Sequence, residues 1–257
     1  MTDLLKIDKQ GHTTVVTMNN PPANTWTPDS LNAFRELVLE LGSDPDNRAL
    51  VLASDNEKFF SAGADLKKFA CSKGDGFTFI NAFGAAFEAL ADYPGVSVAA
   101  ITGYAMGGGL EGTLACDFRV AEKQAQLALP EASVGLLPGG LGTQLLPWLV
   151  GESWAKRMIL LGERLSAEQA LEIGLVQEVV DTGKALEKAL EMVARAAKQS
   201  PSSIRACKQL IQAARHRSMA SAASWERELF TKLWDTQDRD EGVSAFLEKR
   251  KPEWKGR

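Results

Sequence analysis

The chain has 257 residues, enough for one large domain or for one domain with a small appendage. Apolar residues make up 45% of the sequence and charged residues 24%, a globular composition that excludes a fibrous or disordered chain. The formal net charge is −4 and the one short basic run that stands out lies at residues 249–251, so nucleic acid is not expected as a partner.

The N-terminal residues and the cysteines indicate the cellular compartment of the protein. The first residues lack a basic segment followed by an apolar one, and no apolar run approaches the ~20 residues that span a bilayer. Cys71, Cys116 and Cys207 are odd in number and widely spaced, which favours free thiols in a reducing compartment. We therefore expect a cytoplasmic protein without membrane association. His12 and His216 lie near opposite ends of the chain, and no metal site is expected.

Alternating strands and helices are expected over the first two thirds of the chain. A helix begins at Thr27–Pro28, where the threonine is the N-cap and proline occupies the first helical position. Glycines 107–109 open a second helix that runs toward Cys116. Further helical sequence surrounds residues 82–90, and strands are expected at residues 4–9, 13–18, 49–53, 97–102, 118–121 and 126–129.

The composition changes after residue 171. We expect a last strand at 176–180 and then helices at 185–199, 201–214 and 218–238. No linker rich in glycine, serine or proline separates the two parts. The sequence therefore predicts an α/β layered domain over residues 1–195 and a tightly packed helical region over residues 196–257.

Two solitary carboxylates are the sharpest signal in the sequence. Glu111 is the only charged residue between Asp92 and Asp117, and Glu131 is the only one between Lys123 and Glu152. Both lie in stretches of small and apolar residues that are expected in the core. A lone buried carboxylate costs several kcal/mol unless it is paired, hydrogen-bonded or protonated. Either these are structural carboxylates, or burial raises their pKa toward the range used in acid–base catalysis.

Two turns of small residues accompany the carboxylates. Residues 107–111 (Gly-Gly-Gly-Leu-Glu) follow a strand and open a helix, and residues 61–65 (Ser-Ala-Gly-Ala-Asp) form a second turn before a short helix. Backbone N–H groups at such helix starts lack intrahelical partners and favour negative charge. Together the turns provide the donors that an oxyanion hole needs, although tight packing alone also selects small residues.

The sequence also contains a possible dinucleotide-binding motif. Residues 107–112 match the pattern G-x-G-x-x-G, and Glu131 lies 19 residues beyond Gly112. The motif normally lies in the first βαβ unit, whereas here about a hundred residues precede it. Glu111 would also place a carboxylate in the phosphate site, so a nicotinamide cofactor is not expected.

Several segments resemble the crotonase, or enoyl-CoA hydratase/isomerase, family. Residues 60–67 (FSAGADLK) are similar to its first oxyanion motif, and residues 102–112 (TGYAMGGGLEG) to its second. Residues 129–144 resemble the stretch with the catalytic glutamate and the glycine-rich turn after it. Asp117 and the segments 165–170, 174–176 and 246–251 also fit, so the resemblance runs along essentially the whole chain.

The resemblance implies a spiral of ββα units and a C-terminal helical region that assembles chains into trimers, often paired into hexamers. It implies an acyl-CoA substrate and no separate cofactor, because coenzyme A is part of the substrate. By position, Ala64 and Gly108 supply the oxyanion-hole amides. Glu111 and Glu131 match the two catalytic carboxylates, and Gly139 matches the turn whose amide orients the water.

The resemblance also indicates where coenzyme A binds. Lys67 and Lys249 match basic positions near the CoA phosphates, Lys249 by a contact that would cross a subunit boundary. Ala62, Asp65 and Leu66 belong to the same CoA-binding stretch as Lys67.

Some positions depart from the pattern of the hydratases. Leu141 replaces the first of two glycines that usually precede the threonine, Leu129 stands where many hydratases have a glutamine, and residues 20–26 differ from the commonest form.

Because both carboxylates are present, we predict an enoyl-CoA hydratase that adds water across the 2,3 double bond of a trans-2-enoyl-CoA. Two alternatives stay open, a Δ3-Δ2 enoyl-CoA isomerase that uses Glu131 alone and a non-catalytic acyl-CoA binding protein. Five phenylalanines near the two turns either wall an acyl pocket or belong to the helical core: Phe69, Phe77, Phe79, Phe83 and Phe87.

Overall fold

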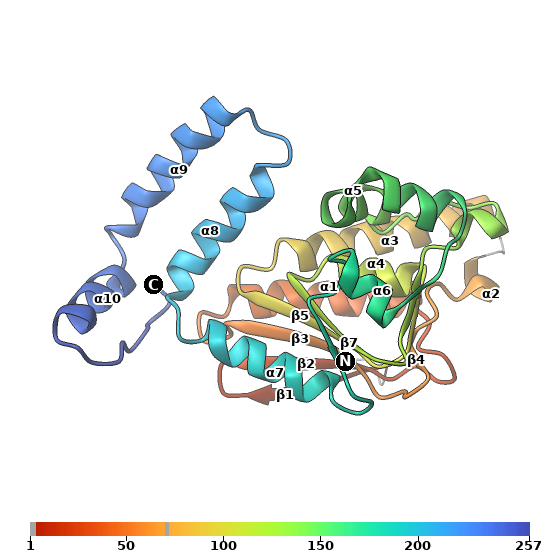
Figure 1. Ribbon diagram of the computed structural model, residues 1–257, viewed down its shortest axis with the longest axis horizontal. Helices are drawn as coiled ribbons and strands as arrows, with labels where there is room; N and C mark the ends of the chain where they lie inside the picture. The colour runs from red at the N-terminus through yellow and green to blue at the C-terminus, as the bar shows by residue number, and fades with distance from the viewer. Residues whose placement is uncertain (1–3, 70–71) are drawn as a thin grey trace.

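The computed structural model describes residues 4–69 and 72–257, in which two sheets and the surrounding helices form a spiral (Figure 1). The larger sheet has the order β1 (Leu5–Gln10), β2 (Thr13–Met18), β3 (Ala49–Ser54), β5 (Val96–Ile101), β7 (Phe118–Glu122) and β10 (Glu178–Val180). The smaller sheet has the order β4 (Phe59–Ser61), β6 (Tyr104–Met106), β8 (Gln126–Ala128) and β9 (Leu165–Ser166).

The spiral arises because the chain passes through a strand of the larger sheet, then a strand of the smaller sheet, then a helix, and repeats this order. From β2 to β10 the strands of the larger sheet pair in parallel, as do β4, β6 and β8 in the smaller one. Thus β3 and β4 precede α2 (Leu66–Phe69) and α3 (Lys73–Ala91), and β5 and β6 precede α4 (Gly108–Leu114). Next, β7 and β8 precede a 3-10 helix, η1 (Glu131–Val134), and α5 (Gly142–Leu160). The expected ββα repeat is confirmed.

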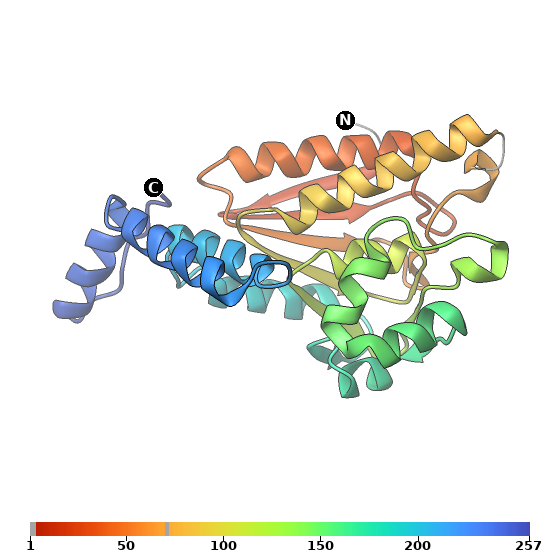
Figure 2. The ribbon, with the colours of Figure 1, turned by 90° about the horizontal axis from the view of Figure 1, so that it is seen from above.

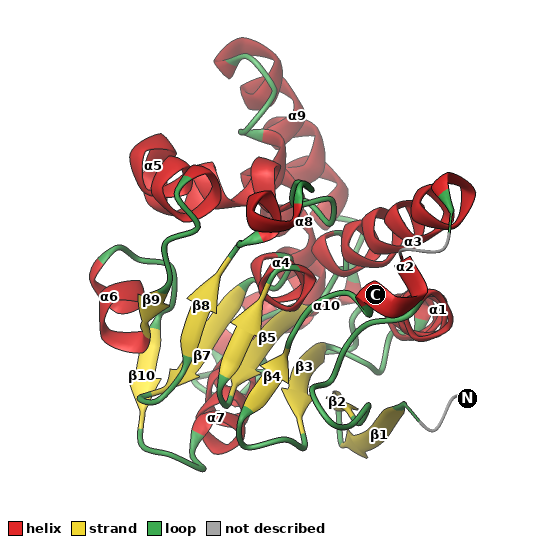
Figure 3. Cartoon of the chain, turned by 90° about the vertical axis from the view of Figure 1, so that its right-hand side faces the viewer, coloured by secondary structure: helices red, strands yellow, loops and turns green. Residues whose placement is uncertain are grey.

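Helices cover both faces of the larger sheet. Along β3, Leu50 and Leu52 point into the core that includes residues of α1 (Pro28–Ser43) and α3, while Val51 points into a second core with Ala185 and Ala189 of α7 (Ala185–Ala196). This alternation is the two-residue period of a strand that is buried on both faces. Figure 3 shows the helices on both sides of the strands.

Local signals explain where the helices begin. Thr27 caps α1, its hydroxyl accepts from the Ser30 N–H at 3.1 Å, and Pro28 is the first helical residue, as predicted. Ser166 caps the short α6 (Ala167–Glu172) in the same way. α5 was not expected, and its sequence explains this, because Pro147 lies inside it and Gly151 interrupts it with a φ of 79°.

The C-terminal helices extend from the spiral as an arm (Figures 1 and 2). They are α8 (Pro201–Ala213), α9 (Met219–Leu233) and α10 (Gln237–Leu247). The prediction of one helix over residues 218–238 is wrong, because α9 ends at Leu233 and Thr236 caps a new helix by accepting from the Arg239 N–H. Neither glycine nor proline marks this break, and its local signal is the N-cap Thr236.

Asp238 fixes the end of the chain to this arm. Its side chain is 1% exposed, and its two oxygens accept hydrogen bonds from Ser200, Ser202, Lys255 and Gly256. Burial acts to raise the pKa of this carboxyl, but the hydrogen bonds outweigh it and hold the pKa below its usual range.

We expect Asp238→Asn to lower the free energy of unfolding by about 2–4 kcal/mol, because the amide leaves two or more buried donors unpaired. Since the pKa of Asp238 is lower in the folded state, this contribution is present at neutral pH and is lost as the pH falls through the folded-state value. Urea unfolding at pH 7 and at a pH well below 3.8, the ordinary pKa of an aspartate, measures both effects. Asp240→Asn, at a side chain that is 69% exposed, is the control, and an equal loss in both variants would contradict this role.

Candidate active site

A cavity of about 460 Å³ lies where the two small-residue turns meet α3 and the loop after η1. Glu111 and Glu131 both line it. So do Ala62, Gly63 and Ala64 from the first turn and Gly107 and Gly108 from the second. The structure therefore brings together the two turns and the two carboxylates that the sequence singled out.

The two turns lie directly against each other. Gly63 has a φ of +88°, and a Cβ added there would lie 2.8 Å from the Met106 carbonyl oxygen and 3.2 Å from the Gly108 nitrogen. Only glycine fits at this position, because the conformation and the contact both exclude a side chain. Among the described residues, the structure gives no hydrogen-bond partner to the N–H of Ala64 or of Gly108. Two free amides therefore sit beside one cavity.

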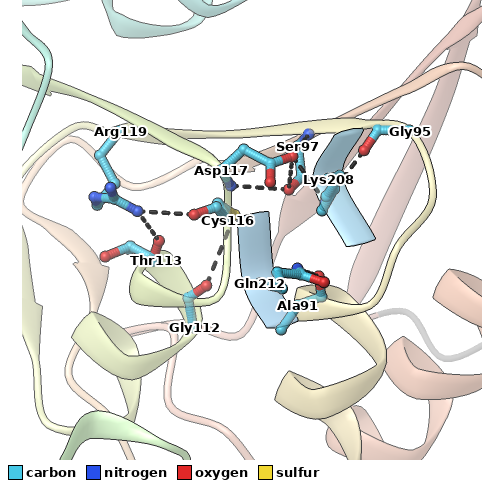
Figure 4. Close-up of polar contacts among 10 residues, drawn as sticks. All are labelled: Ala91, Gly95, Ser97, Gly112, Thr113, Cys116, Asp117, Arg119, Lys208 and Gln212. Atoms are coloured by element: carbon cyan, nitrogen blue, oxygen red, sulfur yellow. Dashed lines mark hydrogen bonds and ion pairs between the residues drawn. The ribbon is translucent and has the colours of Figure 1, made fainter. Parts of the chain in front are cut away.

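α4 carries both Gly108 and Glu111, and a buried arginine holds its other end. Arg119, on β7, is 1% exposed and donates from Nη1 to the carbonyl oxygens of Thr113 at 3.1 Å and Cys116 at 2.8 Å (Figure 4). Its Nε donates to the Leu175 carbonyl at 2.6 Å. The cation thus satisfies carbonyls at the negative end of the helix dipole. Burial lowers the pKa of this guanidinium to about 10, so it is charged at neutral pH.

The residues that follow α4 also tie the helical arm to the spiral. Asp117 accepts from the Ser97 N–H and from Lys208 Nζ of α8, both at 2.8 Å (Figure 4). Gln212, one turn further along α8, donates to the Ala91 carbonyl at 2.6 Å. The arm is therefore anchored directly beside the C-terminal end of α4.

Glu111 is buried, and one oxygen of its carboxylate is held by backbone hydrogen bonds. Its side chain is 3% exposed, and its Oε1 accepts from the N–H groups of Gly140 and Gly142, both at 2.8 Å. Burial, and to a smaller extent the nearby Glu131, raise the pKa of this carboxyl, whereas the backbone amides of Gly142, Gly140 and Gly139 lower it; the net pKa is about 7. Glu111 is thus fixed in place, with a pKa raised toward neutral pH.

Glu131 has a different environment. It is the first residue of η1, and neither of its buried carboxylate oxygens has a hydrogen-bond partner among the described residues. A Cβ added to Gly107 would lie 3.1 Å from Glu131 Oε1, so the carboxylate lies over the start of α4. Burial raises the pKa of Glu131 to about 7. A folded protein rarely leaves such a group unpaired, which points to a role in chemistry.

The expectation that the whole stretch around Glu131 belongs to the core is wrong. Val134 is 57% exposed and Leu137 68%, and both line the cavity.

The phenylalanines near the two turns fall into two groups. Phe77 and Phe83 line the cavity, whereas Phe79 and Phe87 are fully buried in the core. The side chain of Phe69 and the whole of Cys71 lie outside the described residues.

The predicted CoA-binding residues fall into two groups. Ala62 and Leu66 line the cavity. Asp65 and Lys67 are their chain neighbours at the start of α2, where Asp65 Oδ1 accepts from the Lys67 N–H. Lys249 lies just beyond α10 with a φ of 56° and is not among the cavity residues of its own chain. Within one chain the structure therefore does not bring Lys249 to the others.

Two of the positions that depart from the hydratase pattern, Leu141 and Leu129, lie beside the turn that binds Glu111 and are not among the residues that line the cavity. Leu141 has a φ of 79°, a conformation that favours glycine, and lies between the two residues that donate to Glu111. Leu129 is fully buried, and its Cδ1 lies 3.1 Å from a Cβ added to Gly142. Gly139, in the same turn, does line the cavity.

The sequence reading missed Arg119, and one signal could have revealed it. It is the charged residue inside an otherwise apolar predicted strand, residues 118–121.

Over the described residues, 4–69 and 72–257, no group of three or more potential metal-binding side chains occurs. No helix in that part of the chain is long and apolar enough to cross a membrane.

A ββα spiral whose two turns and two carboxylates meet at one cavity defines a protein of the crotonase fold. The model of the enoyl-CoA hydratase/isomerase family matches residues 8–257. The chain belongs to this family.

Relatives extend over the full length of the chain. The structure of DspI from Pseudomonas aeruginosa is 58% identical, with a TM-score of 0.96 over 98% of this chain and 97% of that one. The crystal structure of an enoyl-CoA hydratase from Bacillus anthracis is 33% identical, with a TM-score of 0.95 over 99% and 100% of the two chains. The 2,3-dehydroadipyl-CoA hydratase of Escherichia coli K12 is 36% identical over 257 residues, the whole of both chains.

Proposed function

We propose that the protein is an enoyl-CoA hydratase, which adds water across the 2,3 double bond of a trans-2-enoyl-CoA to give a 3-hydroxyacyl-CoA. The single observation that carries this proposal is the pair of buried carboxylates, Glu111 and Glu131, that face one cavity beside two free backbone amides. Coenzyme A is part of the substrate, and the reaction needs no other cofactor.

The thioester is proposed to bind between the two turns. Its carbonyl oxygen accepts hydrogen bonds from the N–H groups of Ala64 and Gly108, so negative charge that develops on this oxygen is stabilised. One such donor typically lowers the barrier by ~3–4 kcal/mol. Ala62, Asp65, Leu66 and Lys67 lie beside this position, on the stretch where coenzyme A is proposed to bind.

The water is proposed to lie between the two carboxylates. Glu111, held on one oxygen by the turn after Gly139, accepts a proton from the water as its oxygen bonds to C3. Glu131 gives its proton to C2, and the C2–C3 π bond is lost. One proton has then moved from Glu131 to Glu111, and exchange with solvent restores the pair. The Gly139 amide helps to orient the water.

The pH dependence follows from the two raised pKa values. The reaction needs one carboxylate protonated and the other ionised, and both groups have a pKa of about 7. At low pH both are protonated and the base is lost; at high pH both are ionised and the proton donor is lost. We expect a bell-shaped profile of kcat with its maximum near pH 7, measured with crotonyl-CoA. A rate that stays constant from pH 5 to pH 9 would contradict this assignment.

The direct test of the reaction is the ultraviolet absorbance of the conjugated enoyl thioester in crotonyl-CoA. We expect rapid loss of this absorbance with the protein and almost none with Glu111→Ala or Glu131→Ala. If Glu111→Ala keeps full activity on a 3-enoyl-CoA and the protein does not hydrate crotonyl-CoA, the reaction is isomerisation through Glu131. If acyl-CoA binds but no turnover occurs, the protein is a binding protein.

The helical region over residues 196–257 is proposed to assemble the chains into a trimer or into a hexamer of two trimers. Large apolar side chains on the arm are exposed in the single chain, among them Ile211 at 69%, Phe230 at 63% and Phe246 at 83%. Burial of such a patch between chains would remove it from water. In this assembly Lys249 would reach the CoA phosphates of a neighbouring chain.

A further inference from the structure

We propose that Ser61 is a positioning residue for the oxyanion hole, because its hydroxyl group ties the first turn to residues 20–26 and thereby directs the Ala64 N–H into the cavity. This inference rests on the proposed function in assigning the Ala64 N–H to the thioester oxygen. It also gives a role to residues 20–26, which differ from the commonest form of the family.

The segment before α1 pairs with the first turn through a parallel bridge between Trp26 and Ala64. The Trp26 N–H donates to the Gly63 carbonyl at 2.8 Å, and the Asp65 N–H donates to the Trp26 carbonyl at 3.0 Å. In such an extended pairing, successive N–H groups point to opposite sides. Because the Asp65 N–H points toward Trp26, the Ala64 N–H points the other way, and Ala64 lines the cavity.

Ser61 holds this pairing from inside the protein. Its side chain is fully buried, and its Oγ donates to the Asn24 carbonyl at 2.6 Å and accepts from the Gly63 N–H at 3.2 Å. The hydroxyl group therefore joins the segment before α1 to the residue that immediately precedes Ala64. Without it, the Asn24 carbonyl and the Gly63 N–H would each lose a buried hydrogen bond.

Asn24 keeps the acceptor of this hydrogen bond in place. It is buried and has a φ of 49°, a left-handed conformation that asparagine adopts more readily than most residues. Its Nδ2 donates to Ser54 Oγ at 2.7 Å, and its Oδ1 accepts from the Asn20 N–H at 2.8 Å. The carbonyl that faces Ser61 is thus anchored to the end of β3.

Ser61 also contacts the second turn. A Cβ added to Gly109 would lie 2.3 Å from the Ser61 carbonyl oxygen and 2.8 Å from the Ser61 Cβ, so the two backbones touch. Gly109 follows Gly108, the other proposed oxyanion donor. Ser61 therefore lies where one residue fixes the position of the Ala64 amide relative to the Gly108 amide, and a displacement of about 1 Å in such a site is enough to cost about 100-fold in rate.

The test measures the polarisation of the thioester carbonyl in butyryl-CoA, a saturated ester that has no double bond to hydrate. The carbonyl carries ¹³C, and its NMR shift is compared between the free and the bound ester. We expect a downfield change with the wild type and the loss of about half of this change in Ser61→Ala, because one of the two donors is misplaced. For crotonyl-CoA, kcat should fall by about tenfold to 100-fold, while the Kd of butyryl-CoA stays within about threefold.

Two further variants separate hydrogen bonding from packing. Ser61→Cys has nearly the size of serine, but a thiol is a weak donor and acceptor, so we expect losses close to those of Ser61→Ala. Thr14→Val is the control, because it removes a buried hydroxyl group that donates to Asn47 and is not among the cavity residues. It should lower the stability to urea and leave kcat and the carbonyl shift unchanged. Wild-type kcat and carbonyl shift in Ser61→Cys would overturn the proposal, since Ser61 would then only fill space.

The proposed reaction and the role of Ser61 can fail separately. A carbonyl shift that depends on the Ser61 hydroxyl group, in a protein that hydrates no enoyl-CoA, would refute the proposed reaction and leave the role of Ser61 standing. Binding of butyryl-CoA to the wild type without any change in the carbonyl shift would overturn this inference, because Ala64 would then donate no hydrogen bond to the thioester.

Discussion

Glu131→Gln is expected to lower kcat at least about 100-fold, the usual scale of general acid–base catalysis, with KM within about threefold of the wild-type value. Glutamine has nearly the shape of glutamate but holds no transferable proton. Neither oxygen of Glu131 has a hydrogen-bond partner among the described residues, so the substitution breaks no visible contact. Steady-state kinetics with crotonyl-CoA measure the effect.

The same variant should be more stable than the wild type at alkaline pH. Burial raises the pKa of Glu131 from 4.5 to about 7, so the folded state holds the proton more tightly than the unfolded state. The wild type therefore loses stability as the pH rises from about 4.5 to 7, while Glu131→Gln does not. We expect a gain of about 1–3 kcal/mol at pH 8, measured by urea unfolding. An inactive variant that is also less stable at pH 8 would indicate a structural role.

Arg119→Met should lower the free energy of unfolding by about 3–5 kcal/mol, because three buried carbonyl oxygens each lose a hydrogen bond from the guanidinium, although that of Thr113 still accepts from the Cys116 N–H. Two of these carbonyls, of Thr113 and Cys116, lie at the C-terminal end of α4, whose other end carries Gly108 and Glu111. The loss of these hydrogen bonds should therefore also shift Gly108 and Glu111 in the active site. Where the variant is still folded, we expect kcat to fall about tenfold with little change in KM.

Arg119→Lys separates the two effects of this arginine. Lysine keeps the charge at the end of α4 but has a single nitrogen, so it cannot reproduce the three hydrogen bonds. We expect a stability between those of wild type and Arg119→Met, and partial recovery of kcat. If Arg119→Lys recovered stability fully but not kcat, or if Arg119→Met kept full kcat, Arg119 would not position α4 in the proposed way.

The parts of the fold that were predicted well carry local signals. Thr27–Pro28 marks the start of α1, and the glycines at 107–109 mark the start of α4. Both depend on interactions within a few residues, which the sequence displays directly. The kinked α5 was missed because Pro147 and Gly151 are local signals against a helix, and the break between α9 and α10 is marked locally by the N-cap Thr236, which a period-based reading of the helix passes over.

The candidate site shows a second limit of sequence reasoning. Glu111 and Glu131 were recognisable because each is alone in an apolar stretch. The apolar residues around Glu131 were assigned to the core, but Val134 and Leu137 face the cavity and solvent. Composition does not distinguish the lining of a ligand cavity from a core, because both exclude water. Lys249 is not among the residues that line the cavity of its own chain, and a pattern within one sequence cannot describe a contact between chains.

The most direct test of the account is the mass of the acyl product formed from crotonyl-CoA in heavy-oxygen water. The account predicts that the wild-type protein yields a hydroxybutyryl-CoA with one heavy oxygen on C3, and that the product is absent with Glu111→Gln and Glu131→Gln. Recovery of crotonyl-CoA with unchanged mass, by a wild-type protein that binds it, would contradict the claim that Glu111 and Glu131 add water to an enoyl thioester.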